Sequence, residues 1–500
     1  MRLKSLVLTA AAVLLAANTA SAVEFKASGE WFVGFGGVES TFLQNNNGGN
    51  DVFQAMQRYD LELEVIVSES LSGVLGLRIG DLAWGRAEDG GALGTDGVVV
   101  KVHSAYLNWA VPGTELRLQM GLMGVALPNA AGGSAIWDEQ TAGVVANYAF
   151  NDTVGLTAFW LRPFNDNYTN ANGYVYRTNG RNPDFYLDNA DYFGLSLPLT
   201  FDGVEVTPWA MIGMVGKNAL DAADADGEAV WGDTHAYSLP QPFATGTVEP
   251  GSWTPRGHAY RTEFYAGLPV VISAFDPFTF EFDFNYGYAS SMGKYSVADR
   301  RGVVRRADTR REGWLVKALA EYKLEWGTPG IFAWYASGDD GDIRNGSERM
   351  PTVLPTSTFT SFMQDGENGW SLNGGYDRLL QYGGTWGIGL QLKDVSFVED
   401  LKHTLRVAYW GGTNSEGMIR HITDNTGWGS GGIYLTTRDH LIEANLDTTW
   451  QIYENLEAVV ELGYIVNGID RSAWRKNMRD VPTPAKADAW KAALIMKYSF

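Results

Sequence analysis

The last eleven residues of the chain, 490–500, alternate with a period of two, and this pattern constrains the fold more than any other feature. One face of the segment carries Trp490, Ala492, Leu494, Met496, Tyr498 and Phe500. Both lysines, Lys491 and Lys497, fall on the opposite face. A period of two predicts a β-strand with one apolar side. Aromatic residues stand at both ends of that side, and a tilted strand of about this length crosses the hydrocarbon core of a bilayer. The segment is therefore predicted to cross a membrane.

Alternating segments of this kind recur along the whole chain, and we count about 18 of them, with 16 inside the error of such a count. They run for about 9–13 residues, longer than the usual strands of soluble proteins. Short turns join them at one end. Long loops join them at the other end, notably Val215–Tyr260, Ser290–Gly313 and Gly338–Gly384. This asymmetry predicts an all-β fold: a transmembrane antiparallel β-barrel of about 16–18 strands, with short periplasmic turns and long extracellular loops.

The direction of the two faces separates this barrel from a soluble β-sandwich. In Phe278–Tyr288, six aromatic residues alternate with polar residues or glycine. On an open sheet such a face would promote aggregation, whereas in a closed barrel it meets lipid. A basic residue on the lipid face would cost roughly 2–4 kcal/mol at mid-bilayer. We therefore expect the aromatic residues to point outward and the charged residues to line an enclosed water column.

The N-terminus has the pattern of a secretory signal sequence. Arg2 and Lys4 precede the apolar run Leu6–Ala17, and Ala20-Ser21-Ala22 is a small-residue cleavage pattern. We predict that residues 1–22 are removed near Ala22, which takes the net charge from −20 to about −22. The chain has no cysteine, which suits an exported protein. Because the sequence contains no Pro/Ser-rich linker, residues 23–500 are predicted to form one barrel.

Several stretches resemble the outer-membrane homotrimeric porins of sulphate-reducing bacteria. They are residues 23–27 (VEFKA), 50–58 (NDVFQAMQR), 126–135 (ALPNAAGGSA), 151–160 (NDTVGLTAFW), 193–204 (FGLSLPLTFDGV) and the closing strand. The resemblance implies a trimeric, water-filled pore for small hydrophilic solutes in the outer membrane. A chain that ends on such a strand with a terminal Phe500 also resembles outer-membrane barrels whose last strand is read by the assembly machinery.

A barrel of 16–18 strands is too wide to be filled by side chains and leaves an aqueous channel. The sequence therefore favours a passive diffusion porin that needs no cofactor. The alternative is a surface adhesin or structural outer-membrane protein that acts through its long loops. Nothing indicates an enzyme, because no histidine lies in a His-Glu-x-x-His motif or beside a Gly-x-Ser-x-Gly motif. An acidic chain also gives no indication of nucleic-acid binding.

The connection 122–141 is the third long one, and general porins fold their third loop into the lumen. Small residues in 126–135 would let its backbone pack against the barrel wall, and Asp138 and Glu139 would give the constriction a negative edge. The alternative is an outer loop that packs at the trimer axis. Two further charged residues, Arg58 and Arg117, are expected on lumen faces. Acids and bases mix on these faces, so net selectivity does not follow from them.

Six arginines in Ser290–Gly313 form the most unusual charge feature. They are Arg300, Arg301, Arg305, Arg306, Arg310 and Arg311. In the pore they would bind oxyanions and bias flux toward anions. Outside the pore they would bridge lipopolysaccharide phosphates or acidic loops.

A cluster of carboxylates is a weak candidate for a Ca²⁺ site. It comprises Asp339, Asp340 and Asp342. Carboxylates are the ligands that Ca²⁺ prefers, but the full loop pattern of an EF-hand is missing. A solvated loop tip is the favoured interpretation, and no metal site is predicted.

Overall fold

The computed structural model describes residues 23–39, 52–84, 100–165, 189–216, 247–248, 254–255, 260–298, 302–364, 382–421, 435–477 and 487–500. The predicted signal sequence, residues 1–22, lies outside these ranges. So do most of the long connection Val215–Tyr260 and the arginines at positions 300 and 301.

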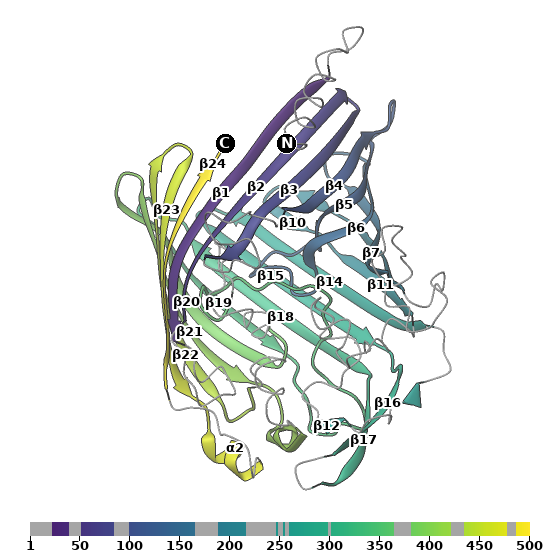
Figure 1. Ribbon diagram of the computed structural model, residues 1–500, viewed down its shortest axis with the longest axis vertical. Coiled ribbons are helices and arrows are strands. Elements are labelled where there is room, and N and C mark those ends of the chain that lie inside the picture. Colours follow the sequence, from purple (N-terminus) through teal and green to yellow (C-terminus); the bar gives the residue numbers. More distant parts are fainter. Residues whose placement is uncertain are drawn as a thin grey trace, which may run out of the picture.

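An 18-strand antiparallel barrel forms the body of the molecule, as the alternation predicts (Figure 1). Two of its strands are interrupted, so that β8 and β9 make one and β10 and β11 another. The strands are β1 (Glu24–Glu39), β2 (Val52–Ser68), β3 (Leu71–Ala83), β4 (Val100–Ala110), β5 (Leu116–Ala126), β6 (Asp138–Ala149), β7 (Gly155–Asn165), β8 (Asn189–Ser196), β9 (Leu199–Phe201), β10 (Val204–Val206), β11 (Trp209–Gly216), β14 (Tyr260–Phe275), β15 (Phe278–Ala289), β18 (Arg311–Tyr322), β19 (Thr328–Ala336), β20 (Thr385–Val398), β21 (Leu401–Gly412), β22 (His440–Tyr453), β23 (Leu456–Gly468) and β24 (Ala489–Ser499). The barrel closes where β1 pairs with β24, from Glu30 opposite Ser499 to Glu39 opposite Trp490.

Turns at one end of the barrel are short, and we call this the turn end. Gly203 makes the β9–β10 turn with a φ of 68°, which a residue without a Cβ adopts at little cost. Pro277 follows a cis peptide bond in the β14–β15 turn. The C-terminus also lies at the turn end, where Phe500 exchanges two backbone hydrogen bonds of 3.1 Å with Gly29 of β1 (Figure 1). The opposite end, called the loop end, carries the long connections.

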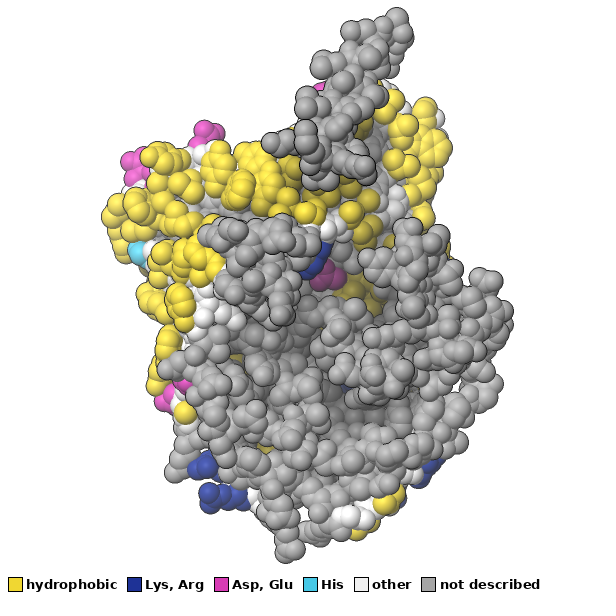
Figure 2. Space-filling view, in the orientation of Figure 1, with side chains coloured by type: hydrophobic (Ala, Val, Ile, Leu, Met, Phe, Trp, Pro, Cys, Tyr) yellow, Lys and Arg dark blue, Asp and Glu magenta, His cyan; other side chains and the backbone are white. Residues whose placement is uncertain are grey.

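Side chains on β15 point in the predicted directions. Phe280, Phe282 and Phe284 are each 39 % exposed on the outside, whereas Asp283 between them is 1 % exposed inside. On β24, Trp490 and Tyr498 are outside, and Lys491 is buried within the barrel. Figure 2 shows hydrophobic side chains gathered over the described strands toward the turn end. The expectation that these aromatic residues point outward from the barrel is confirmed.

Smaller elements extend from the loop end. They are β12 (Thr247–Val248), β13 (Thr254–Pro255), β16 (Gly293–Ala298) and β17 (Val304–Asp308) in a small sheet, with the 3₁₀ helix η6 (Glu416–His421) and the helix α2 (Arg471–Asn477). In Figure 1, α2 lies at the end of the barrel opposite the C-terminus. No helix in the described part of the chain is long and apolar enough to cross a membrane.

Candidate functional site

The β5–β6 loop, residues 127–137, lies inside the barrel. Ala131 and Trp137 are fully buried, and Ile136 is 1 % exposed. The loop is shorter than the connection 122–141 expected from the sequence, because β5 continues to Ala126 and β6 begins at Asp138. Small residues let its backbone approach the wall, as expected for an inward loop.

A buried ion pair holds this loop against β15 and β18. Asp283 Oδ2 accepts hydrogen bonds from the backbone N–H groups of Ala130 (3.0 Å) and Ala131 (2.7 Å). Lys317 Nζ lies 3.4 Å from the same oxygen and donates to the carbonyl oxygens of Ala131 and Gly133. Both charged side chains are 1 % exposed or less. Charge and loop backbone therefore satisfy one another, as buried charges require.

A second inward segment comes from the β19–β20 loop, residues 337–384, of which 337–364 and 382–384 are described. It pairs with the β5–β6 loop backbone to backbone. Leu354 N–H donates to Ile136 O (2.9 Å), and Thr356 N–H donates to Ser134 O (2.8 Å). The hydroxyl of Tyr382 adds a hydrogen bond to the carbonyl oxygen of Gly132. The two loops thus form one internal structure.

The far side of this segment is attached to the wall made by β22–β24. Backbone N–H groups of Phe362 and Met363 both donate to Glu443 Oε1 at 3.1 Å. The Ser361 hydroxyl donates to Asp447 (3.0 Å), and Lys491 Nζ donates to Ser361 O (2.9 Å). Lumen-facing charges on this wall therefore hold the inward segment in place.

The wall made by β1–β4 is different, because the charges that pair across its strands stay partly exposed. Arg58 lies 3.5 Å from Glu30 and 3.0 Å from Asp60. Arg78 forms two hydrogen bonds with Asp60, of 2.7 and 3.1 Å, and its Nη2 lies 3.5 Å from His103 Nε2. The two arginine side chains keep 19 % and 22 % of their surface exposed. We call these five residues the charged row.

A cavity of about 800 Å³ opens at the turn end. Its lining includes the predicted lumen residue Arg117 together with Glu24, Lys26, Glu64 and Gln119. Both signs of charge occur on strands β1, β2 and β5. The cavity and the charged row share strands β1 and β2, so the polar surface continues along one side of the barrel.

Asp138 and Glu139, predicted at the edge of the constriction, are exposed at the start of β6. Asp138 Oδ2 accepts a hydrogen bond from the Thr356 hydroxyl (3.1 Å). Glu139 is close enough to His103 to interact electrostatically. One of the two acids therefore touches the inward loops, and the other approaches the charged row.

The arginine-rich segment divides between the outside and the lumen. Arg305 and Arg306 are exposed on β17, in a hairpin with β16 at the loop end. Arg310 is ion-paired with Glu312 at the rim. Arg311, 4 % exposed, lies on the lumen face of β18. Arg300 and Arg301 are outside the described residues. The segment does not act as one cluster, because consecutive residues of a strand face opposite sides.

The three carboxylates considered as Ca²⁺ ligands each interact with a different partner. Asp339 is buried and accepts from the Ser347 hydroxyl. Asp340 accepts from the backbone N–H of Asp342 (2.7 Å), and Asp342 is paired with Arg344 (2.6 Å). Among the described residues, no group of three acidic, histidine or cysteine side chains converges as a metal site.

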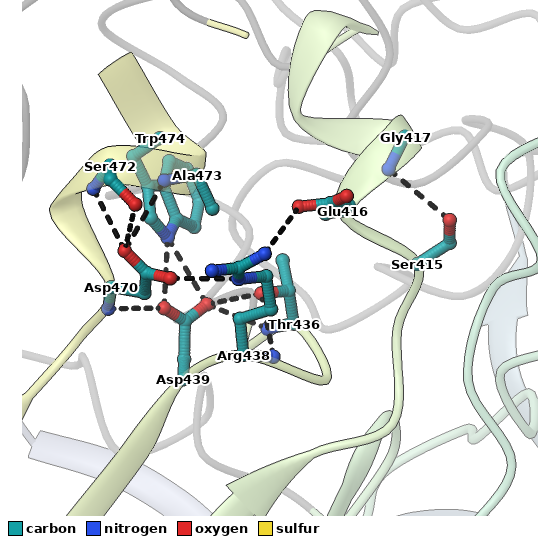
Figure 3. A network of polar contacts seen from close by, with 10 residues as sticks. All are labelled: Ser415, Glu416, Gly417, Thr436, Arg438, Asp439, Asp470, Ser472, Ala473 and Trp474. Carbon is teal, nitrogen blue, oxygen red and sulfur yellow. Dashed lines mark hydrogen bonds and ion pairs between the residues drawn. The ribbon is translucent and has the colours of Figure 1, made fainter. Parts of the chain in front are cut away.

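A polar network joins two further loops at the loop end (Figure 3). Trp474 Nε1 of α2 donates to both oxygens of Asp439, at 3.2 and 3.1 Å. Arg438 donates to Asp470 (2.7 Å) and pairs with Glu416 of η6 (3.9 Å). A hydrogen bond from the Ser472 hydroxyl lowers the pKa of Asp470 from its ordinary value of 3.8 to about 2. Burial raises the pKa of Asp439.

Sequence reasoning did not single out Asp283, Lys317 or Arg78. The available signal was weak: Asp283 and Lys317 occupy paired positions on neighbouring strands. Pairing of this kind is visible only once the register is known.

Comparisons with known proteins support the fold. No protein-family model and no curated protein matches the sequence. Among solved structures, Pseudomonas aeruginosa OccK8 (OprE) matches with a TM-score of 0.51 and 10 % identity, covering 96 % of this chain and 99 % of that one. Pseudomonas aeruginosa OccK5 (OpdH) matches with a TM-score of 0.48 and 12 % identity, covering 95 % and 98 %. The chain is thus similar to OccK8 in fold. The class defined by its fold is the transmembrane 18-strand antiparallel β-barrel.

Proposed function

We propose that the chain forms a water-filled channel in the outer membrane for passive diffusion of small hydrophilic solutes and ions. The observation that carries this proposal is the charged row. Arg58 and Arg78 stay partly exposed on an inner wall. The contacts described above attach the two inward loops to other strands, β15, β18, β22 and β24. Charges that served only to pack the interior would be covered, as Lys317 and Asp283 are. Partly exposed charges inside a lipid-facing barrel are typical of a wetted pore wall.

Reconstitution of the purified protein in a planar bilayer tests this function. We expect stepwise conductance and, in vesicles, uptake of small sugars. Folded protein that gives no current would contradict the channel and favour the alternative, a surface adhesin or structural barrel. The feature that favours this alternative is the extent of structure at the loop end, including the small sheet and the network of Figure 3.

The remaining parts of the proposal concern location and partners. We propose export after removal of residues 1–22, outer-membrane assembly through the strand that ends at Phe500, and a homotrimer of the type found in sulphate-reducing bacteria. The predicted signal sequence and the resemblance described above support these points. Cross-linking of membranes, followed by electrophoresis without boiling, is expected to give a trimer band. A monomer band alone would contradict the assembly.

Arg305 and Arg306 are proposed to contact lipopolysaccharide phosphates, because both are exposed at the loop end. An anion bias of the channel would then rest on the partly exposed Arg58 and Arg78 of the charged row. We expect the reversal potential of an Arg305→Ala/Arg306→Ala channel in a salt gradient to equal that of the wild type. A changed reversal potential would instead place these two arginines in the ion path.

A further inference from the structure

One row of lumen-facing residues crosses five strands near the loop end. In order across β8, β11, β14, β15 and β18, the row is Tyr192, Gly213, Glu263, Ala289 and Arg311. The two small residues leave room for large neighbours. A Cβ at Gly213 would stand 2.5 Å from the ring of Tyr192, so the tyrosine leans across the glycine. Its hydroxyl reaches Glu263 Oε2 at 2.9 Å.

The two oxygens of Glu263 have different surroundings. Oε2 accepts hydrogen bonds from Tyr192 and from Tyr265, each at 2.9 Å. Oε1 lies 3.2 Å from Arg261 Nε. All four side chains are fully buried. The contact between Oε1 and Nε is an ion pair without hydrogen-bond geometry, so Glu263 leaves the guanidinium group of Arg261 without a hydrogen bond.

The other edge of Arg261 is unsatisfied. Its Nη1 and Nη2 atoms are buried and have no hydrogen-bond partner among the described residues. A buried charged donor without an acceptor is among the most costly arrangements in a protein interior. A second guanidinium, that of Arg311, is close enough to interact with both Arg261 and Glu263. Two buried cations thus face one carboxylate.

We propose that a small inorganic anion binds over Ala289, between the guanidinium groups of Arg261 and Arg311. Adjacent strands lie about 4.8 Å apart, so β14 and β18 are separated by roughly 10 Å across β15. On this row the residue between Glu263 and Arg311 is Ala289, whose side chain is a single methyl group. An anion there accepts from the free edge of Arg261 and from Arg311, in the bidentate way that guanidinium favours.

The surrounding charges agree with an anion rather than a cation. The covering segment of the β19–β20 loop brings Arg349, 8 % exposed, and Asp339, 2 % exposed, toward Arg311. Asp339 accepts a hydrogen bond from the Ser347 hydroxyl. The charged side chains described around this site are therefore three arginines and two acids, so positive charge is in excess. The site does not depend on whether the barrel conducts, so it stands or falls separately from the proposed channel.

Bromide gives a direct test, because it replaces chloride and scatters anomalously. Crystals of the purified wild-type protein grown or soaked in bromide are expected to show an anomalous peak within hydrogen-bond distance of Arg261 Nη1 or Nη2. The peak is expected to be lost in Arg261→Gln, which keeps hydrogen bonding but removes the charge. The matched control is Arg305→Gln on the exposed hairpin, in which the peak stays. No peak in the wild type overturns the proposal without reference to any variant.

Thermal unfolding in detergent gives a second readout and compares chloride with inorganic phosphate as the bound anion. At constant ionic strength, replacing gluconate by chloride is expected to raise the Tm of the wild type and of Arg305→Gln, but not of Arg261→Gln. A parallel titration with inorganic phosphate asks whether an oxyanion is preferred to a halide. Equal Tm shifts in the wild type and Arg261→Gln for both anions would overturn the site.

Discussion

Substitution of Lys317 by Met is expected to release the β5–β6 loop from the barrel wall. The ammonium group of Lys317 makes three interactions at once: the ion pair with Asp283 and hydrogen bonds to the carbonyl oxygens of Ala131 and Gly133. Met keeps most of the length of the side chain but supplies no donor. Asp283 keeps its two backbone N–H donors and loses its counter-ion.

The size of the effect follows from the burial of the pair. Removing one partner of a buried ion pair costs about 3–5 kcal/mol, since the remaining charge is left uncompensated. Each 1.4 kcal/mol is a factor of about ten in an equilibrium constant. The docked state of the loop therefore loses roughly two to four powers of ten against undocked states. The backbone hydrogen bonds to residues 353–358 remain, so we expect partial opening rather than unfolding.

Single-channel recording measures this opening, provided that the barrel conducts. We expect Lys317→Met to raise the open-channel conductance and to add current noise from loop movement. Lys323→Met is the matched control, because Lys323 is exposed at the β18–β19 turn of the same hairpin. Limited proteolysis is the second readout and is expected to cut near the β5–β6 loop only in Lys317→Met. Conductance, noise and proteolysis all equal to those of the wild type would refute the role given to this ion pair.

Three further predictions follow from the wall and the loops. Phe282→Arg should destabilise the folded barrel by roughly 2–4 kcal/mol in urea unfolding, since Phe282 faces lipid, whereas Thr279→Arg on the lumen face of the same strand should cost less. Asp470→Asn should speed amide exchange at the start of α2. The folded pKa of Asp470, about 2, lies below its ordinary value of 3.8. Its contribution to the stability of the folded state is therefore complete above pH about 4 and is lost as the pH falls through about 2. Arg78→Gln on the partly exposed charged row should shift the reversal potential, whereas Arg406→Gln, whose side chain is 3 % exposed and paired with Asp447, should lower stability without that shift.

The strand pattern could be predicted from sequence because lipid imposes a strict rule at every second residue. Phe280 and Phe284 had to share a face, and Lys491 had to take the other, whatever the detailed packing. For 126–135 the small residues left an inward loop and an outer loop at the trimer axis both open. The partners of this loop were not indicated either, because Ala131 lies 152 residues from Asp283 and 186 residues from Lys317 in the chain. No local pattern encodes which wall such a loop meets.

The interior of this barrel shows why loops rather than side chains fill part of the lumen. A barrel of 18 strands is too wide for its inward residues to meet, so only chain can reach across it. Chain inside the lumen brings backbone polar groups that need partners. On the β15–β18 and β22–β24 walls those partners are the charged residues, such as Glu443, which accepts two backbone N–H groups. On β1–β4 the charges bind one another and stay partly exposed. The walls differ because the backbone of the inward loops needs hydrogen-bond partners only where it meets a wall. The β1–β4 wall keeps its charges partly exposed and is left for water.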